Sequence, residues 1–286
     1  MSAGVGVTRL SLLVGAILLS ALASGTGSSA NPLPPMIHYP AFIDHEPIEI
    51  GSDEDFTEEN GVRSGSGTLG DPYRIESLVI VVDGITTAVR IHDTSAYFSV
   101  GNVKIQYDTQ PLYHGYPSGM EFDDCSNGSV FDCVVNGVSF GLSLDGCSNF
   151  RLRYNSIQGL SADESTGIFA ASCNDMSILD NEAKDCSYGV RIWSSTDGAV
   201  EANTISNSYI GISLTDCRGF QIGSNTFYAT THYYSDDSWE DNTWLASKSI
   251  TGSELGLVLL LGIVVPAETA ILLFVFLKLR RRPREG

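Results

Sequence analysis

The chain of 286 residues is long enough for two ordinary domains or for one long β domain. Its 16 basic and 34 acidic residues give a formal net charge of −18, and 43% of its residues are hydrophobic. That apolar content excludes a wholly disordered acidic chain, and the shortage of clustered Lys and Arg excludes nonspecific binding to nucleic acid.

An apolar run near the N-terminus predicts a secretory signal peptide. Arg9 precedes the run at residues 10–22, and Ala21-Leu22-Ala23 provides small residues at a cleavage site. We therefore expect residues 1–23 to be removed and residues 24–47 to form a linker. An uncleaved anchor helix is the alternative, although the run is short for a membrane span.

A second apolar segment, residues 255–277, contains no Lys or Arg and is long enough to cross a membrane. Five basic residues follow it in 278–286, so the positive-inside rule predicts a cytoplasmic tail and an extracellular body. We expect residues 246–254 to connect the body to this single span. Glu268 within the span either has a function or is tolerated as a protonated side chain. The exported body, residues 24–252, carries 10 basic and 31 acidic side chains.

The sequence between these ends is repetitive. Glycines recur at intervals of 22, 26, 22 and 22 residues, and apolar residues follow each glycine at fixed offsets. The apolar residues alternate in short runs separated by Ser, Asn, Asp and Gly, which predicts three short strands per repeat. Such repeats are typical of a β-solenoid, in which equivalent positions of successive coils stack about 4.8 Å apart. The repeat glycines are Gly119, Gly141, Gly167, Gly189 and Gly211.

An asparagine column is expected inside the solenoid, fourteen residues after each glycine. A buried amide at a turn can hydrogen-bond the backbone of neighbouring coils and tolerates unusual backbone angles. Cys133 takes the first position of the column, and four asparagines follow it: Asn155, Asn181, Asn203 and Asn225.

A cysteine column is expected six residues after each glycine, with Ser195 in place of one cysteine. Export permits disulfides, but the serine favours a small residue that fills an inward turn. Binding of a soft metal by thiolates, next to Asp124, Asp175 and Asp216, is the alternative. The cysteines of the column are Cys125, Cys147, Cys173 and Cys217.

The segment before the repeats carries a more specific motif. It includes Pro47-Ile48-Glu49-Ile50, Asn60-Gly61-Val62 and Gly65-Ser66-Gly67-Thr68-Leu69-Gly70-Asp71-Pro72-Tyr73. With the asparagine-containing coils, it resembles right-handed parallel β-helix proteins of archaeal cell surfaces. These belong to the carbohydrate-binding and sugar-hydrolase β-helix superfamily, which includes periplasmic copper-maturation (NosD-type) proteins. The resemblance covers residues 48–245 and implies an all-β, right-handed parallel β-helix of six to seven coils with an N-terminal cap.

One face of this helix is the predicted ligand site. Side chains two and four residues after each glycine should face outward from the first strand of each coil. Two insertions, at 106–118 and 161–166, should border the same face, and the first contains Tyr113 and Tyr116. Aromatic rings beside polar groups suit sugar rings, while ordinary solvated strand residues are the alternative. The predicted binding residues are Arg90, His92, Glu121, Asp123, Asp145, Phe169, Arg191, Trp193, Tyr113 and Tyr116.

Three functions fit this pattern. A surface module that binds glycans is favoured, and a structural or adhesive surface protein is one alternative. The other is a polysaccharide lyase or glycoside hydrolase that uses Asp123 and Asp145, since glycoside hydrolysis needs two carboxyl groups. Motifs of the pectin hydrolases are missing from the sequence, which favours binding over catalysis. The histidines do not repeat in register, so no metal site is predicted, and calcium is left open as a cofactor. Asn127 begins a glycosylation sequon.

Overall fold

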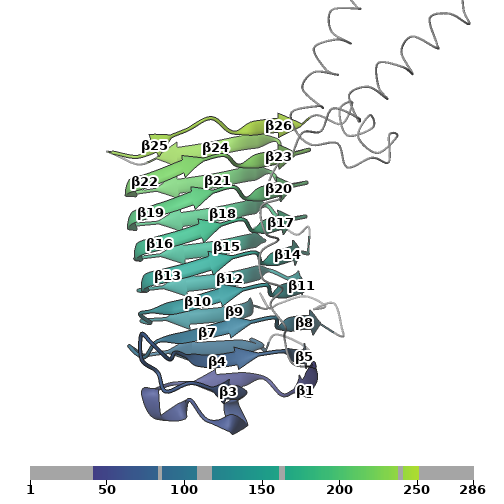
Figure 1. The fold of residues 1–286 in the computed structure, drawn as a ribbon. Helices are drawn as coiled ribbons and strands as arrows, with labels where there is room; N and C mark the ends of the chain where they lie inside the picture. Colours follow the sequence, from purple (N-terminus) through teal and green to yellow (C-terminus); the bar gives the residue numbers. More distant parts are fainter. Residues whose placement is uncertain (1–40, 83–85, 108–117, 161–164, 238–240, 251–286) are drawn as a thin grey trace, which may run out of the picture. The chain divides into compact units, whose positions relative to one another are not determined.

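The computed structural model describes residues 41–82, 86–107, 118–160, 165–237 and 241–250. These residues form an all-β, right-handed parallel β-helix of about seven turns (Figure 1), which confirms the fold expected for the body. The signal peptide, membrane span and basic tail expected from the sequence lie outside the described residues. Within the described ranges, no helix is both long and apolar enough to cross a membrane.

Each coil adds one strand to each of three sheets, which we call the first, second and third sheets in chain order. The first sheet has eight strands, all paired in parallel, and begins each coil at or next to the repeat glycine. Its strands are β2 (Ile48–Ile50), β6 (Val89–His92), β9 (Ser118–Asp123), β12 (Phe140–Asp145), β15 (Thr166–Ala171), β18 (Tyr188–Trp193), β21 (Ile210–Thr215) and β24 (His232–Asp237).

The second sheet has nine strands, and its one antiparallel pair, β3 with β4, closes the N-terminal end. Two short 3-10 helices, η1 (Asp53–Asp55) and η2 (Glu58–Asn60), precede that pair. The strands are β3 (Val62–Ser64), β4 (Tyr73–Glu76), β7 (Phe98–Gly101), β10 (Gly128–Phe131), β13 (Ser148–Arg153), β16 (Asn174–Leu179), β19 (Thr196–Glu201), β22 (Arg218–Gly223) and β25 (Thr243–Trp244).

The third sheet also has nine parallel strands, and it extends beyond the expected limits of residues 48–245. Its first strand lies within the expected linker and pairs with β5. Its last strand lies after residue 245 and pairs with β23. The strands are β1 (Ile43–His45), β5 (Leu78–Val82), β8 (Lys104–Tyr107), β11 (Val134–Val138), β14 (Ser156–Gly159), β17 (Glu182–Lys184), β20 (Thr204–Ser206), β23 (Thr226–Tyr228) and β26 (Lys248–Ile250).

The repeat glycines are required by close packing at the start of each first-sheet strand. A Cβ on Gly189 would lie 2.6 Å from Ile205 Cγ2 and 2.7 Å from the carbonyl oxygen of Gly211 in the next coil. The other repeat glycines meet the same two kinds of neighbour, a third-sheet side chain and the next backbone carbonyl. Glycine therefore recurs because the backbone of one coil must approach the next coil at this point.

The asparagine column forms the buried hydrogen-bonded ladder that the sequence predicts. Asn203 Nδ2 donates to the Ile178 carbonyl at 2.8 Å and to Asn225 Oδ1 at 3.1 Å. The Asn181 backbone N–H donates to Asn203 Oδ1 at 2.8 Å, so each amide connects three coils. The Cys133 N–H donates to Asn155 Oδ1 at 3.1 Å and ends the ladder. Backbone groups at a buried turn are thus paired.

The cysteine column also takes the inward arrangement that the sequence favours. All six cysteines lie among the described residues, all are buried, and none of them forms a disulfide. Cys125 Sγ donates to the Asp123 carbonyl at 3.3 Å, and Ser195 Oγ donates to the Trp193 carbonyl at 2.7 Å. Cys186, which has no place in the predicted column, fills a different turn, and Ser208 takes the equivalent position in the next coil. Serine and cysteine are interchangeable here because both side chains are small and both can donate a hydrogen bond to the backbone carbonyl.

All six thiols should be unreactive in the folded protein. Thiol reagents attack the thiolate, and burial raises the pKa of Cys133 and of Cys186 to about 12. Titration with a chromogenic disulfide reagent at pH 8 should therefore detect almost no thiol in native protein and all six in denatured, unreduced protein. Fewer than six thiols after denaturation would show that neighbouring cysteines are oxidised to disulfides.

Candidate functional site

The outer face of the first sheet carries the eight described residues that were predicted to bind a ligand. Arg90 pairs in register with Glu121 across β6 and β9, and Arg191 lies three strands further along that column. A parallel column contains Asp123, Asp145 and Trp193. The described candidates are exposed or half-buried, so the alternation rule placed them correctly.

A charged cluster occupies the N-terminal part of this face and consists of Glu49, Arg90, His92, Asp93, Glu121 and Asp123. The Arg90 guanidinium lies 3.2 Å from Asp123, 3.8 Å from Glu121 and 3.9 Å from Glu49. The hydrogen bond to Asp123 is the main reason that the pKa of Arg90 is raised. Arg90 is therefore already neutralised by protein carboxylates and has few donors left for a ligand.

His92 lies between two carboxylates of this cluster. Its Nδ1 is 2.8 Å from Asp93 Oδ2, and its Nε2 is 3.0 Å from Glu49 Oε1. The hydrogen bond to Asp93 is the main cause of a raised pKa of His92, with Glu49 adding to it. The pairing of protonated His92 with these carboxylates stabilises the folded protein. This stabilisation is fully present below the ordinary pKa of about 6.5 and is lost as the pH rises through the folded-state pKa.

Proton NMR should therefore show His92 titrating above its ordinary value. Asp93→Asn should lower the midpoint, because it removes the carboxylate nearest to Nδ1 and keeps a residue that tolerates the positive φ of 55° at this position. The signal can be assigned by its loss in His92→Asn. A His92 midpoint at or below the ordinary value, unchanged by Asp93→Asn, would contradict the paired geometry.

An aromatic platform lies further along the same face and consists of Phe140, Phe169, Tyr188 and Trp193, with Arg191 among them. The Phe169 ring contacts Trp193 edge-on at 5.3 Å between centroids and Phe140 at 5.9 Å. The Arg191 guanidinium lies 4.2 Å from the ring centres of both Tyr188 and Trp193. Trp193 is 37% exposed although it is large and apolar, so its ring can contact a ligand.

The two candidate catalytic carboxylates are neighbours in the fold. Asp123 and Asp145 are register partners on adjacent parallel strands, β9 and β12, and both face outward. They differ in their surroundings, since Asp123 is paired with Arg90, whereas Asp145 is exposed and forms no ion pair within the described ranges. The two residues lie on adjacent strands, but only Asp123 is held in place by an ion pair.

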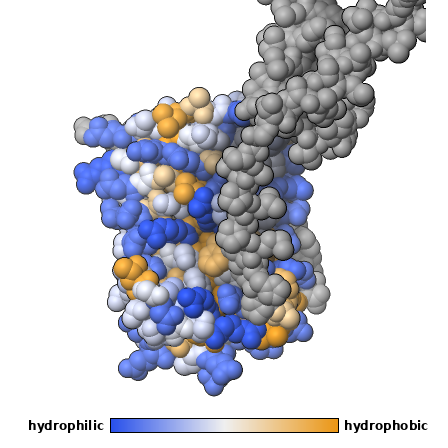
Figure 2. Space-filling view, viewed as in Figure 1, coloured by the Kyte–Doolittle hydropathy of each residue, from blue (hydrophilic) through white to orange (hydrophobic). Residues whose placement is uncertain are grey.

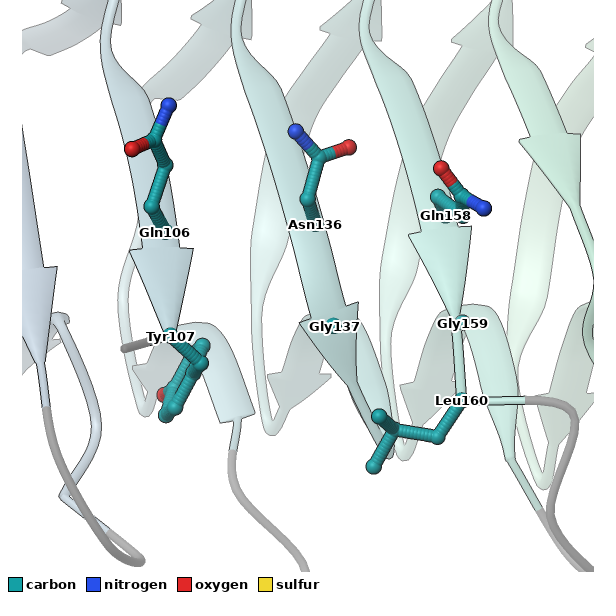
Figure 3. A pocket seen from close by; sticks show the side chains of 7 residues that line it. All are labelled: Gln106, Tyr107, Asn136, Gly137, Gln158, Gly159 and Leu160. Carbon is teal, nitrogen blue, oxygen red and sulfur yellow. The ribbon is translucent and has the colours of Figure 1, made fainter. Parts of the chain in front are cut away.

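A hollow of about 530 Å³ lies on a different face from the predicted groove. Three amide side chains on neighbouring third-sheet strands, Gln106, Asn136 and Gln158, extend from the sheet beside Tyr107 and Leu160 (Figure 3). A bulge between Asn136 and Val138 interrupts the sheet there. A second hollow, lined by Gly67, Tyr73 and Tyr97 among others, also lies away from the first-sheet strands.

Several predicted features are not placed on this surface. Tyr113 and Tyr116, with most of both insertions, lie outside the described residues, so their role in a groove stays a prediction. Asn127 is described, and its Nδ2 donates to the Ser95 carbonyl at 3.0 Å while its Oδ1 accepts from Asn149 at 2.7 Å. A glycan on Asn127 would replace one of the two Nδ2 hydrogens and would leave Oδ1 able to accept from Asn149.

Four residues of the site were missed in the sequence: Glu49, Asp93, Phe140 and Tyr188. Glu49 lies in the segment before the repeats. Its position between the apolar residues Ile48 and Ile50 was the available signal that its side chain faces outward from a strand. Phe140 and Tyr188 precede repeat glycines, where alternation predicts an inward side chain. Alternation stops at these glycines, because the glycine and the apolar residue after it are both buried.

The surface around these groups is mostly polar. On the face seen in Figure 2, hydrophilic residues dominate and hydrophobic ones form separate small groups. Among the described residues, no group of three His, Cys, Asp or Glu side chains could hold a metal ion. Calcium at the acidic part of the first sheet therefore stays a prediction.

The sequence and the fold both have known relatives. Residues 56–255 match the family described as periplasmic copper-binding protein (NosD). No curated protein sequence matches the chain. The fold is similar to the catalytic domain of a GH87 α-1,3-glucanase solved with nigerose, with 12% identity and a TM-score of 0.55. That match covers 77% of this chain and 47% of the glucanase domain, so the chain spans about half of that domain.

A second solved structure is more distant. Endopolygalacturonase I from Stereum purpureum, complexed with galacturonate, is 16% identical with a TM-score of 0.47. The match covers 63% of this chain and 66% of that enzyme. At 12% identity, the similarity to the glucanase domain shows a common fold and does not transfer a substrate.

Proposed function

The chain belongs to the family described as periplasmic copper-binding protein (NosD), and from this premise we propose that it is an extracellular, membrane-tethered module that binds a glycan. The glycan would lie on the outer face of the first sheet. The observation that carries the proposal is the aromatic platform, where the Phe169 ring contacts both Phe140 and Trp193 on the outer face of the sheet. The periplasmic family description agrees with an exported body.

The platform has the chemistry that sugar recognition needs. Sugar rings have apolar faces that stack on aromatic rings and hydroxyl edges that need hydrogen-bond partners. Polar side chains next to the platform, such as Ser143 and Asp145 on β12 and Thr215 on β21, can provide those partners. Because β-strands hold these side chains, the rings are fixed before a ligand arrives and little ordering is lost on binding.

Copper does not fit the described residues, although the family description names it. Soft copper ions prefer thiolate and thioether ligands. The six thiols of this chain are buried, and hydrogen bonds to backbone carbonyls hold several of them, Cys125 and Cys217 among them. No cluster of three candidate ligands occurs in the described ranges. We therefore assign no copper-dependent step to this surface.

Hydrolysis or lyase chemistry is the second candidate, and the register pair Asp123 and Asp145 supports it. Glycosidases place two carboxyl groups about 5 to 9.5 Å apart, a range that side chains on adjacent strands can reach. The ion pair of Asp123 with Arg90 disfavours this function, because a catalytic acid must hold and release a proton.

A glycan array probed with the intact protein tests the proposal. We expect retention on at least one class of polysaccharide and no release of reducing ends or unsaturated products from it. Release of such products, abolished by Asp123→Asn and Asp145→Asn, would favour the enzyme instead. Failure to bind any glycan would leave a structural or adhesive protein and overturn the proposal.

A further inference from the structure

Arg191 differs from Arg90 in how its charge is compensated. Arg90 contacts three carboxylates, whereas Arg191 forms no ion pair with any described residue. Its guanidinium instead lies against the rings of Tyr188 and Trp193, each at 4.2 Å. Stacking occupies the faces of a guanidinium and leaves the N–H groups on its edge free to donate.

Among the described residues, the register neighbours of Arg191 on the first sheet are not acidic. Its register neighbours are Phe169 on one side and Ser213 on the other. In the column of Trp193, the nearest carboxylates are Asp145 and Asp237, each two strands away. Two strand spacings amount to about 10 Å, which is close to the screening length at physiological salt. The body as a whole, residues 24–252, has 31 acidic and 10 basic side chains, so this gap is not an effect of composition.

We propose that the aromatic platform selects an anionic sugar, whose carboxylate or sulfate pairs with the free edge of Arg191 while its ring lies over Phe169 and Trp193. This inference rests on the proposed function and specifies its ligand class. A planar guanidinium binds a two-oxygen anionic group through parallel hydrogen bonds, so Arg191 provides both charge and direction. The carboxylates of the charged cluster repel such a group, which restricts it to the platform end of the face.

Matched probes test this selection. Binding would be measured by calorimetry with oligogalacturonate, with its carboxyl-reduced neutral counterpart and with a sulfated galactan oligomer. We expect at least one anionic probe to bind more tightly than the neutral one, with an affinity that falls as salt rises. The preferred anionic probe identifies whether carboxylate or sulfate is the natural partner.

Variants then separate the role of Arg191 from that of the platform. Arg191→Gln should weaken binding of the anionic probe by roughly tenfold or more, the effect of losing a hydrogen bond to a charged group, and should leave the neutral probe unchanged. Arg191→Lys should restore part of the loss. The control is Arg153→Gln. Arg153 lies on the second sheet, and its guanidinium is stacked at 4.7 Å on the ring of Tyr154.

The outcomes distinguish this inference from the proposed function. Equal affinity for charged and neutral probes, or full anionic binding by a folded Arg191→Gln protein, would overturn the anionic selection and leave glycan binding intact. If no glycan of any charge binds, both proposals fail.

Discussion

Replacing Asn203 by Ala should lower the free energy of unfolding by about 3 kcal/mol or more. The change removes the acceptor of two Asn181 donors and the donor to the Ile178 carbonyl, all in a buried turn. Each buried group left without a partner costs about 1 to 3 kcal/mol. For a protein of this size the midpoint of thermal unfolding should fall by about 6 °C or more. Calorimetry or circular dichroism measures both quantities.

Asn174→Ala is the matched control for the ladder. Asn174 is exposed, and its amide donates to Thr196 at 2.7 Å on the surface of the second sheet. Water can replace that partner, so this substitution should change stability by less than about 0.5 kcal/mol. Equal effects of the two substitutions would show that the buried ladder does not stabilise the coils as described.

Replacing Trp193 by Ala should weaken glycan binding by roughly thirtyfold, which corresponds to about 2 kcal/mol. Exposed tryptophans in a contact surface commonly contribute this much, because a large rigid ring loses little entropy on binding. Phe169→Ala should have a smaller effect, since Phe169 contributes less exposed surface, and the double variant should bind weakest. Calorimetric titration with the glycan found on the array measures each affinity.

Tyr154→Ala is the control for this experiment. Tyr154 is also exposed, at 52%, and is also stacked on an arginine, but it follows β13 of the second sheet directly. Its loss should leave the affinity unchanged. A loss of affinity as large as that of Trp193→Ala would move the binding surface away from the first sheet.

Much of the fold could be predicted from the sequence because a solenoid repeats the same strands and turns in every coil. The glycine spacing gave the register of the first sheet, which the pairing of Arg90, Glu121 and Ser143 confirms. The Ser195 substitution indicated the inward role of the cysteine column, since serine and cysteine share size and hydrogen bonding. The asparagine ladder followed from the same periodicity.

The parts that were not predicted break the repeat. Phe140 and Tyr188 turn outward because alternation stops at the repeat glycine, so their contacts with Phe169 and Arg191 could not be read from the pattern. The third carboxylate beside Arg90, that of Glu49, lies before the first complete coil. Pairing of this kind depends on side-chain positions in three dimensions, which periodicity does not specify.

A crystal structure of the protein with a bound oligosaccharide tests the central claim most directly. We predict density for a sugar ring over Phe169 and Trp193, on the outer face of the first sheet. Density in the third-sheet hollow beside Gln106 and Asn136, with the first sheet empty, would contradict the claim.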